Sequence, residues 1–165
     1  DKRKTIVIDP GHGGKDTGAI GPRRKYEKTI VLNIGKYLYR ELRKRSYKVF
    51  LTRNKDKFIS LRHRTKMANK KNADIFVSIH ANATRKNMAR QARGIETYFL
   101  SPARSKRAKM VAEQENMGDI NIMNWNSKNT FLTILNQSKI TASNKLAIDI
   151  QKNMLYSLRQ KYGKW

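Results

Sequence analysis

The stretch TIVIDPGHGGKDTGAIG, residues 5–21, joins a short apolar run to a glycine-rich loop that contains one of the chain's three histidines. The run at residues 5–8 predicts a buried strand, because it is continuously apolar and ends at turn-forming residues. Gly11, Gly13 and Gly14 allow a sharp turn and a close approach of the backbone to a ligand. The stretch therefore predicts a binding site at the mouth of a strand.

The rest of the chain alternates between strand-like and helix-like segments. Such alternation predicts a single α/β domain with a mostly parallel central sheet flanked by helices. Ser60 is a candidate helix cap, and loops are expected at residues 81–93 and 118–129. The expected strands are residues 5–8, 47–52, 74–80 and 94–100, and the expected helices are 27–45, 60–71, 102–117 and 130–162. In the first helix, the periodicity predicts an inward face made of Ile30, Ile34, Tyr37, Leu38 and Leu42.

Charge is the most unusual feature of the composition. The 165 residues include 37 Lys and Arg against 12 Asp and Glu, a net charge of +25. That charge predicts an anionic partner, which leaves nucleic acid, an acidic lipid surface and an acidic polymer open beside a merely solvated basic surface. The absence of cysteine excludes disulfides and thiolate chemistry.

Two further features bear on location. No apolar run approaches the ~20 residues of a membrane span. No signal peptide is recognisable, and the opening DKRK resembles a processed or trimmed start. The compartment is therefore not encoded in these residues.

Three potential metal ligands fall where parallel strands would bring them together. His12 follows the first strand, His80 ends the strand at 74–80, and Glu27 opens the first long helix. Ligands of open α/β sheets bind beyond the carboxyl ends of the strands. Two histidines and one carboxylate form the ligand set of a catalytic zinc site with an open fourth position. Asp9 is expected either to bond the second nitrogen of a ligand histidine or to fix the loop.

A phosphate-binding reading of the glycine loop fails on its details. The Walker pattern needs Ser or Thr after Gly-Lys, but Asp16 follows Lys15. The dinucleotide pattern also fails, because the glycine spacing after Gly13 is wrong. An acidic residue at that point would repel phosphate, so nucleotide binding is not expected.

Several motifs together resemble one known family, and they occur in that family's order. They are IVIDPGHGGKDTGAIG (6–21), Glu27, LRHRTKMAN (61–69), DIFVSIHAN (74–82) and GIETYFLS (94–101). The chain resembles the catalytic domain of zinc-dependent N-acetylmuramoyl-L-alanine amidases of the AmiA/AmiB/AmiC type (Amidase_3), over about residues 5–160, nearly the whole of residues 1–165. The resemblance implies a Zn²⁺ site made by His12, Glu27 and His80, with Arg64 and Asn82 as substrate-binding residues.

The same resemblance implies an activity and a location. The reaction would be hydrolysis of the amide between N-acetylmuramic acid and L-alanine of the stem peptide in peptidoglycan. Such enzymes serve cell-wall remodelling and daughter-cell separation in the periplasm or another extracytoplasmic space. The basic loop residues Arg85, Lys86, Arg90 and Arg93 are then expected to attract the stem-peptide carboxylates.

One catalytic part of the family pattern is missing. The family's general base is a glutamate in a late E-x-G-[FY] motif, whereas the last glutamate here is Glu115. We expect the C-terminal end of the domain to be absent, and this stretch to bind zinc but hydrolyse weakly or not at all. Glu96 is a possible substitute base, the alternative being a structural carboxylate.

Residues 102–135 resemble a regulatory insertion found in some of these amidases. There, an inserted helix places a glutamate on the zinc until an activator protein displaces it. Glu113 or Glu115 would be the blocking residue here, or both would lie on an ordinary surface helix beside Arg107 and Lys109. A carboxylate in the fourth position would displace the nucleophilic water.

Two other functions remain alternatives at this stage. A strongly basic domain without catalysis would suit nucleic-acid binding, but the aromatic residues here occupy core-like positions, so no nucleic acid is expected. A peptidoglycan-binding domain that has lost its activity is the other alternative. His63, between Arg62 and Arg64, is expected on the surface, and Arg64 is expected to hold an acidic group of the site or to cap the fold.

Overall fold

The computed structural model describes residues 3–82, 94–99 and 137–163. Its contacts divide the chain into two compact units, Asp1–Lys86 and Asn87–Trp165. Each unit is treated by itself below.

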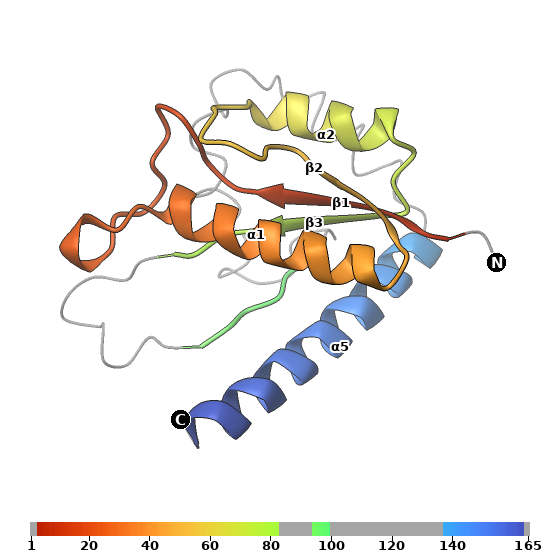
Figure 1. The fold of residues 1–165 in the computed structure, drawn as a ribbon. Helices are drawn as coiled ribbons and strands as arrows, with labels where there is room; N and C mark the ends of the chain where they lie inside the picture. Colours follow the sequence, from red (N-terminus) through yellow and green to blue (C-terminus); the bar gives the residue numbers. More distant parts are fainter. Residues whose placement is uncertain (1–2, 83–93, 100–136, 164–165) are drawn as a thin grey trace. The chain divides into compact units, whose positions relative to one another are not determined.

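A parallel sheet of three strands forms the centre of the first unit (Figure 1). Its strands are β1 (Thr5–Pro10), β2 (Lys48–Leu51) and β3 (Ile75–Ile79), in the order β2-β1-β3. Both neighbours run parallel to β1. The predicted α/β class with a parallel sheet is therefore confirmed, and the three strands match their expected positions to within two residues.

Helix α1 (Glu27–Lys44) covers one face of this sheet. Ile6 and Ile8 of β1 form the buried core there with Val49 of β2, and Leu38 and Leu42 of α1 pack against them. Gly35 brings the helix close to the sheet, because a Cβ at this position would lie 2.7 Å from Pro10 Cγ. The continuously apolar β1 is buried along its whole length, as a central strand of a covered sheet requires.

The opposite face of β1 meets helix α2 (Leu61–Lys70). Strand residues alternate between the two faces, so Asp9 lies opposite Ile8, and Arg64 of α2 reaches Asp9 with a 2.7 Å ion pair. Ser60 occupies the N-cap position as expected, although its side chain makes no capping hydrogen bond. His63 is exposed on this helix, as predicted.

The predicted inward face of α1 is wrong by part of a turn. Ile30, Ile34 and Tyr37 are 39%, 46% and 61% exposed. Leu38 and Leu42 face inward as predicted, and the other inward positions are Glu27, Val31, Leu32 and Gly35. Two of these positions, a glycine and a glutamate, carry no apolar side chain, so a hydrophobic pattern could not register them.

The second unit contains the long helix α5 (Gln137–Tyr162), which confirms most of the helix expected at 130–162. The strand expected at 94–100 is wrong for residues 94–99, which have no strand assignment. The side chain of Gln151 binds this segment, donating to the Ile95 carbonyl at 2.6 Å and accepting from the Thr97 hydroxyl at 2.7 Å. The helix expected at 102–117 and the loop at 118–129 lie outside the described residues.

None of the helices described here is long and apolar enough to cross a membrane.

Candidate metal centre

Three elements of the first unit deliver the three predicted ligands to one end of the sheet. His12 lies two residues beyond β1, Glu27 is the first residue of α1, and His80 directly follows β3. Because β1 and β3 are parallel neighbours, their carboxyl ends meet, and the predicted convergence of the two imidazoles is observed. His12, Glu27 and His80 form a group that could hold a metal ion.

The three candidate ligand atoms form a nearly equilateral triangle. His12 Nε2 lies 3.2 Å from Glu27 Oε1, His80 Nδ1 lies 3.3 Å from the same oxygen, and the two nitrogens are 3.2 Å apart. Zinc bonds of about 2.0–2.1 Å place two tetrahedral ligand atoms roughly 3.3–3.4 Å apart. The triangle therefore fits one face of a zinc tetrahedron, and the donor types fit that ion as well.

Glu27 is held rigidly although it is almost fully buried. Its side chain is 2% exposed. Oε2 accepts the Ala19 N–H at 2.8 Å, and Oε1 accepts the Ala81 N–H at 2.7 Å. Burial alone would raise the pKa of Glu27, but hydrogen bonds from both histidines and these two amides outweigh it and hold the pKa far below its usual range. The carboxylate is thus ionised, as a metal ligand must be.

Asp16 fixes the orientation of the His12 ring. Its Oδ2 lies 2.9 Å from His12 Nδ1, and its Oδ1 accepts the Gly18 N–H at 3.0 Å. A carboxylate at this place accepts a hydrogen bond from a protonated Nδ1, and Nε2 of the same ring faces Glu27 and His80, the usual arrangement around ligating histidines. Asp16 was not among the residues predicted for this contact, which was expected of Asp9 as one alternative. The His-x₃-Asp spacing within one loop was the available signal.

Asp9 instead fixes the loop, which was the other alternative. It is 3% exposed and accepts hydrogen bonds from Thr52 Oγ1 at 2.6 Å and Ser78 Oγ at 3.0 Å, beside its ion pair with Arg64. These contacts join β1 to both neighbouring strands and to α2. Asp9 therefore connects β1, the strand from which the metal-ligand loop begins, to the elements around it.

Two glycines leave room for the ligands themselves. A Cβ on Gly11 would lie 2.7 Å from His80 Nε2, inside the imidazole's contact distance. Gly18, at φ +63°, would place a Cβ 2.7 Å from Glu27 Oε2 and 2.6 Å from His12 Cδ2. The loop is glycine-rich because side chains at these positions would occupy the space of the ligands.

Two buried arginines hold the backbone on which His12 sits. Arg64 donates to the Pro10 and His12 carbonyls, each at 2.8 Å. Arg53, 3% exposed, donates to the carbonyls of Pro10 at 2.9 Å, Gly11 at 2.6 Å and Lys28 at 2.8 Å. Burial, followed by the neighbouring charge of Arg64, lowers the pKa of Arg53. Three consecutive loop carbonyls, 10 to 12, are thus fixed by guanidinium groups.

His12 itself has φ +58°, the left-handed region that ordinary residues avoid. Such a conformation costs of order 1 kcal/mol and persists only where the surroundings enforce it. The arginine contacts supply that enforcement. The sequence analysis did not single out Arg53.

Asp56 and Lys28 make further contacts with the glycine loop. Asp56 accepts the Gly14 N–H at 2.7 Å and pairs with Lys28 Nζ at 2.7 Å, while Lys28 Nζ also donates to the Gly14 carbonyl at 2.8 Å. The hydrogen bond from Lys28, followed by that from Gly14, holds the pKa of Asp56 below its usual value. Segment 53–58 is therefore a clamp on the glycine loop.

The remaining predicted site residues differ in their surroundings. The guanidinium of Arg64 is engaged by Asp9 and the loop carbonyls, which matches the expectation that it holds an acidic group; its contact with substrate stays a prediction. Asn82 is exposed, two residues after His80, and its substrate role also stays a prediction. Glu96 belongs to the second unit and accepts a hydrogen bond from the Tyr98 hydroxyl at 2.6 Å.

The other expected site residues lie outside the described part of the chain. They are Glu113, Glu115, Arg85, Lys86, Arg90 and Arg93.

Several known proteins with similar sequences are N-acetylmuramoyl-L-alanine amidases. Over 123 residues the chain is 42% identical to N-acetylmuramoyl-L-alanine amidase AmiC of Escherichia coli O6:H1, which covers 73% of this chain and 29% of that protein. It is 42% identical over 119 residues to AmiA of Escherichia coli K12, covering 71% of this chain and 40% of AmiA. The chain thus spans less than half the length of these curated relatives.

Solved structures show the same likeness. The catalytic domain of CwlV, an N-acetylmuramoyl-L-alanine amidase from Bacillus (Paenibacillus) polymyxa var. colistinus, aligns with a TM-score of 0.55 at 40% identity, covering 67% of this chain and 61% of that one. An N-acetylmuramoyl-L-alanine amidase from Clostridium difficile 630 aligns with a TM-score of 0.57 at 40% identity, covering 63% and 56%. The family model described as N-acetylmuramoyl-L-alanine amidase matches residues 6–164. Because this family model matches nearly the whole length of the chain, the chain belongs to the N-acetylmuramoyl-L-alanine amidase family.

Proposed function

We propose that this protein is a zinc-dependent amidase that cleaves the bond between N-acetylmuramic acid and L-alanine of the stem peptide in peptidoglycan. The observation that carries the proposal is the triangle of His12, Glu27 and His80, with edges of 3.2–3.3 Å at the carboxyl end of a parallel sheet. Family membership supports the substrate. Because peptidoglycan is an extracytoplasmic polymer, we place the protein in the periplasm or an equivalent space, in cell-wall remodelling and daughter-cell separation.

Each residue of the centre has a distinct role in this proposal. A zinc ion held there would supply Lewis-acid polarisation of the scissile carbonyl and a water of lowered pKa. Glu27 provides the negative charge that makes the site attractive to a divalent cation. Asp16 keeps Nε2 of His12 directed at Glu27 and His80, and the two buried arginines keep its backbone in place. The rigid centre therefore needs little rearrangement to bind its ion.

The proton-transfer step requires a further group. Glu27 and Asp16 are committed to positioning, so neither is offered as the general base. Glu96 remains the residue of this chain proposed for that role, and it is exposed. Asn82 and Arg64 are proposed as substrate contacts. Regulation by residues 102–135, with Glu113 or Glu115 blocking the zinc until an activator binds, is proposed as well.

Metal analysis is the first test of this function. The wild-type chain is expected to retain about one zinc per molecule after gel filtration, and His12→Ala and His80→Ala are expected to lose it, because each removes one of three protein ligands. His63→Ala is the matched control, since this histidine is exposed on α2 and should not alter zinc content. Equal zinc in His12→Ala and wild type would contradict the proposed centre.

The second test is product analysis. Purified peptidoglycan is incubated with the zinc-loaded chain, and new L-alanine amino termini are measured by mass spectrometry. We expect slow release, and its loss in Glu96→Gln if Glu96 is the base. Zinc binding without any new L-alanine termini would instead support a peptidoglycan-binding domain without catalysis. Salt-sensitive binding to duplex nucleic acid in preference to peptidoglycan would contradict both.

A further inference from the structure

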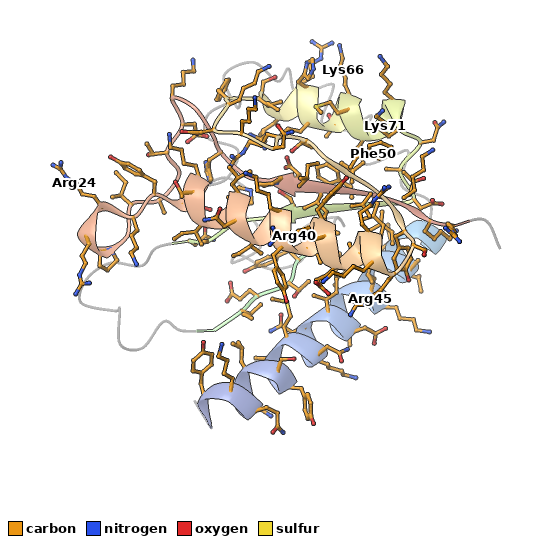
Figure 2. All side chains as sticks on the ribbon, viewed as in Figure 1. Arg24, Arg40, Arg45, Phe50, Lys66 and Lys71 are labelled. Carbon is orange, nitrogen blue, oxygen red and sulfur yellow. The ribbon has the colours of Figure 1, made fainter. Side chains whose placement is uncertain are left out.

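A second concave surface lies on the β2 side of the first unit, next to the clamp segment 53–58. Its volume is about 1290 Å³, and its lining comes from α1, β2, the clamp segment and α2. Arg40 of α1 and Phe50 of β2 mark two of its walls in Figure 2. We call this surface the β2 groove. None of the three metal ligands lines it.

The β2 groove carries positive charge that no carboxylate neutralises. Lys36, Arg40, Lys55 and Lys57 line it, and none of them has an ion pair with an acidic residue of the described part of the chain. Asp56 is the single acidic residue among the lining residues, all of which fall between positions 36 and 67. Asp56 is already paired with Lys28 at 2.7 Å.

Aromatic rings add a second element of recognition. Phe50, Phe58 and Tyr39 also line the groove. Lys71 Nζ lies 4.5 Å from the ring centre of Phe50, and both residues are labelled in Figure 2. Lys15 Nζ lies 4.9 Å from the ring centre of Phe58. A cation–π contact holds a cation without cancelling its charge. The groove thus offers apolar ring surface beside several uncompensated cations, which suits a sugar polymer whose peptide side chains carry carboxylates.

The groove adjoins the glycine loop of the metal centre through the clamp segment. The Lys57 carbonyl packs directly against Gly13, the neighbour of His12, and the Asp56 side chain binds Gly14. A polymer long enough to leave the metal centre along this segment meets the groove next. This adjacency favours the substrate polymer over an unrelated anionic partner.

We propose that the β2 groove is a second binding site for peptidoglycan, which holds stem-peptide carboxylates of a stretch of polymer that is not being cut. This inference rests on the proposed function for its choice of ligand. Attraction between the lysines and carboxylates raises retention on the intact polymer. Short soluble fragments, which cannot reach both sites, gain nothing from it.

The test is retention on purified, insoluble peptidoglycan in the presence of a chelator, so that no cleavage occurs. Lys55→Gln/Lys57→Gln is expected to weaken retention roughly three- to tenfold, because each exposed ion pair contributes up to about 1 kcal/mol. The matched control is Lys66→Gln/Lys70→Gln, which removes the same charge from exposed positions on α2 outside the groove; Lys66 is labelled in Figure 2. Unchanged zinc content and melting temperature show that each variant is folded.

Three results would overturn the proposal. The first is unchanged retention of the groove variant, and the second is an equal loss in the control variant, which would indicate a general effect of net charge. The third is loss of wild-type retention when phosphate-bearing polymers are stripped from the peptidoglycan, which would identify a different ligand. Retention on peptidoglycan is measured without cleavage. Absence of amidase products in the activity test would therefore count against the proposed function, but it would not change the retention result.

Discussion

Strands β1 and β3 each lead to a histidine of the metal centre, yet they are built differently. All six residues of β1 are buried, whereas Phe76 and Ser78 of β3 are exposed and its other residues are half-buried. The loop after β1 is held by Arg53, Arg64 and Asp56. The end of β3 is tied to that same loop, because the Gly11 N–H donates to the Ile79 carbonyl at 3.0 Å.

Because of this difference, most of the contacts that hold the metal centre in place lie on the β1 side. His80 packs over Gly11, and the Ala81 N–H binds Glu27, so the β3 side depends on groups that the β1 side positions. Substitutions that remove contacts of β1 or of the loop after it should therefore displace both histidines. Substitutions on the exposed face of β3 should affect only their own surroundings.

The largest expected effect is the loss of Arg64. Arg64→Met would leave Asp9, 4% exposed at its side chain, as a buried carboxylate without its ion pair, and would leave the His12 carbonyl without its guanidinium donor. Breaking a buried ion pair by removing one partner costs about 3–5 kcal/mol. Urea unfolding should show this loss, and zinc retention should disappear with it.

Arg62→Met is the control for that substitution. It removes a neighbouring arginine that is exposed on the same helix, so the free energy of unfolding should change by less than about 0.5 kcal/mol. If the two variants unfold alike, the idea that the arginine beneath β1 supports the site is wrong.

The same rung of the sheet offers a direct comparison of the two strands. Val7 and Phe76 are register partners, but Val7 is 1% exposed and Phe76 is 42% exposed. Val7→Ala is expected to lower the free energy of unfolding by about 2–3 kcal/mol, because it leaves a cavity. Phe76→Ala should cost less than about 1 kcal/mol. Similar denaturation midpoints for the two variants would mean that β3 is covered as thoroughly as β1.

Gly18 tests the fit of the ligands separately from the strength of the fold. Gly18→Ala would press a methyl group against His12 and Glu27, and displacing supported ligands typically weakens metal affinity about 10–100-fold. Zinc affinity is measured by competition with a chelating dye. Gly163→Ala is the control, because Gly163 also has a positive φ, +77°, but a Cβ there meets nothing within 4 Å. Equal affinities in both variants would rule out crowding at the ligands.

Much of this architecture could be predicted from sequence because it follows from local pattern and chain direction. The apolar runs at β1 and β3 identified parallel strands, and the carboxyl ends of parallel strands meet at one edge. His12, His80 and Glu27 could therefore be grouped although 68 residues separate the two histidines.

The predictions that were wrong or incomplete share a physical cause. At these positions tertiary contacts, rather than the local sequence pattern, determine the structure. The inward face of α1 is set by Glu27 facing the metal centre and by Gly35 packing on β1, and neither adds to hydrophobic periodicity. Residues 94–99 have strand-forming side chains, yet Gln151 binds their backbone and hydroxyl groups. The roles of Arg53 and Asp16 depend on where their side chains reach, which spacing alone does not encode.

The smallest expected effect concerns Asp56, the outer tie of the β1 loop. Its pKa is lowered in the folded state, so its contribution to stability is present above the ordinary aspartate pKa of about 3.9 and is lost as the pH falls through the lower folded value. The metal-free wild-type protein should therefore lose more melting temperature between pH 5 and pH 2.5 than Asp56→Asn does, whereas the two should differ most near pH 7. Because this carboxylate is half exposed, the difference should be small and should shrink in high salt. If the melting temperatures of Asp56→Asn and wild type change in parallel across this range, the loop is held by Arg53 and Arg64 alone. That result would increase the asymmetry between β1 and β3.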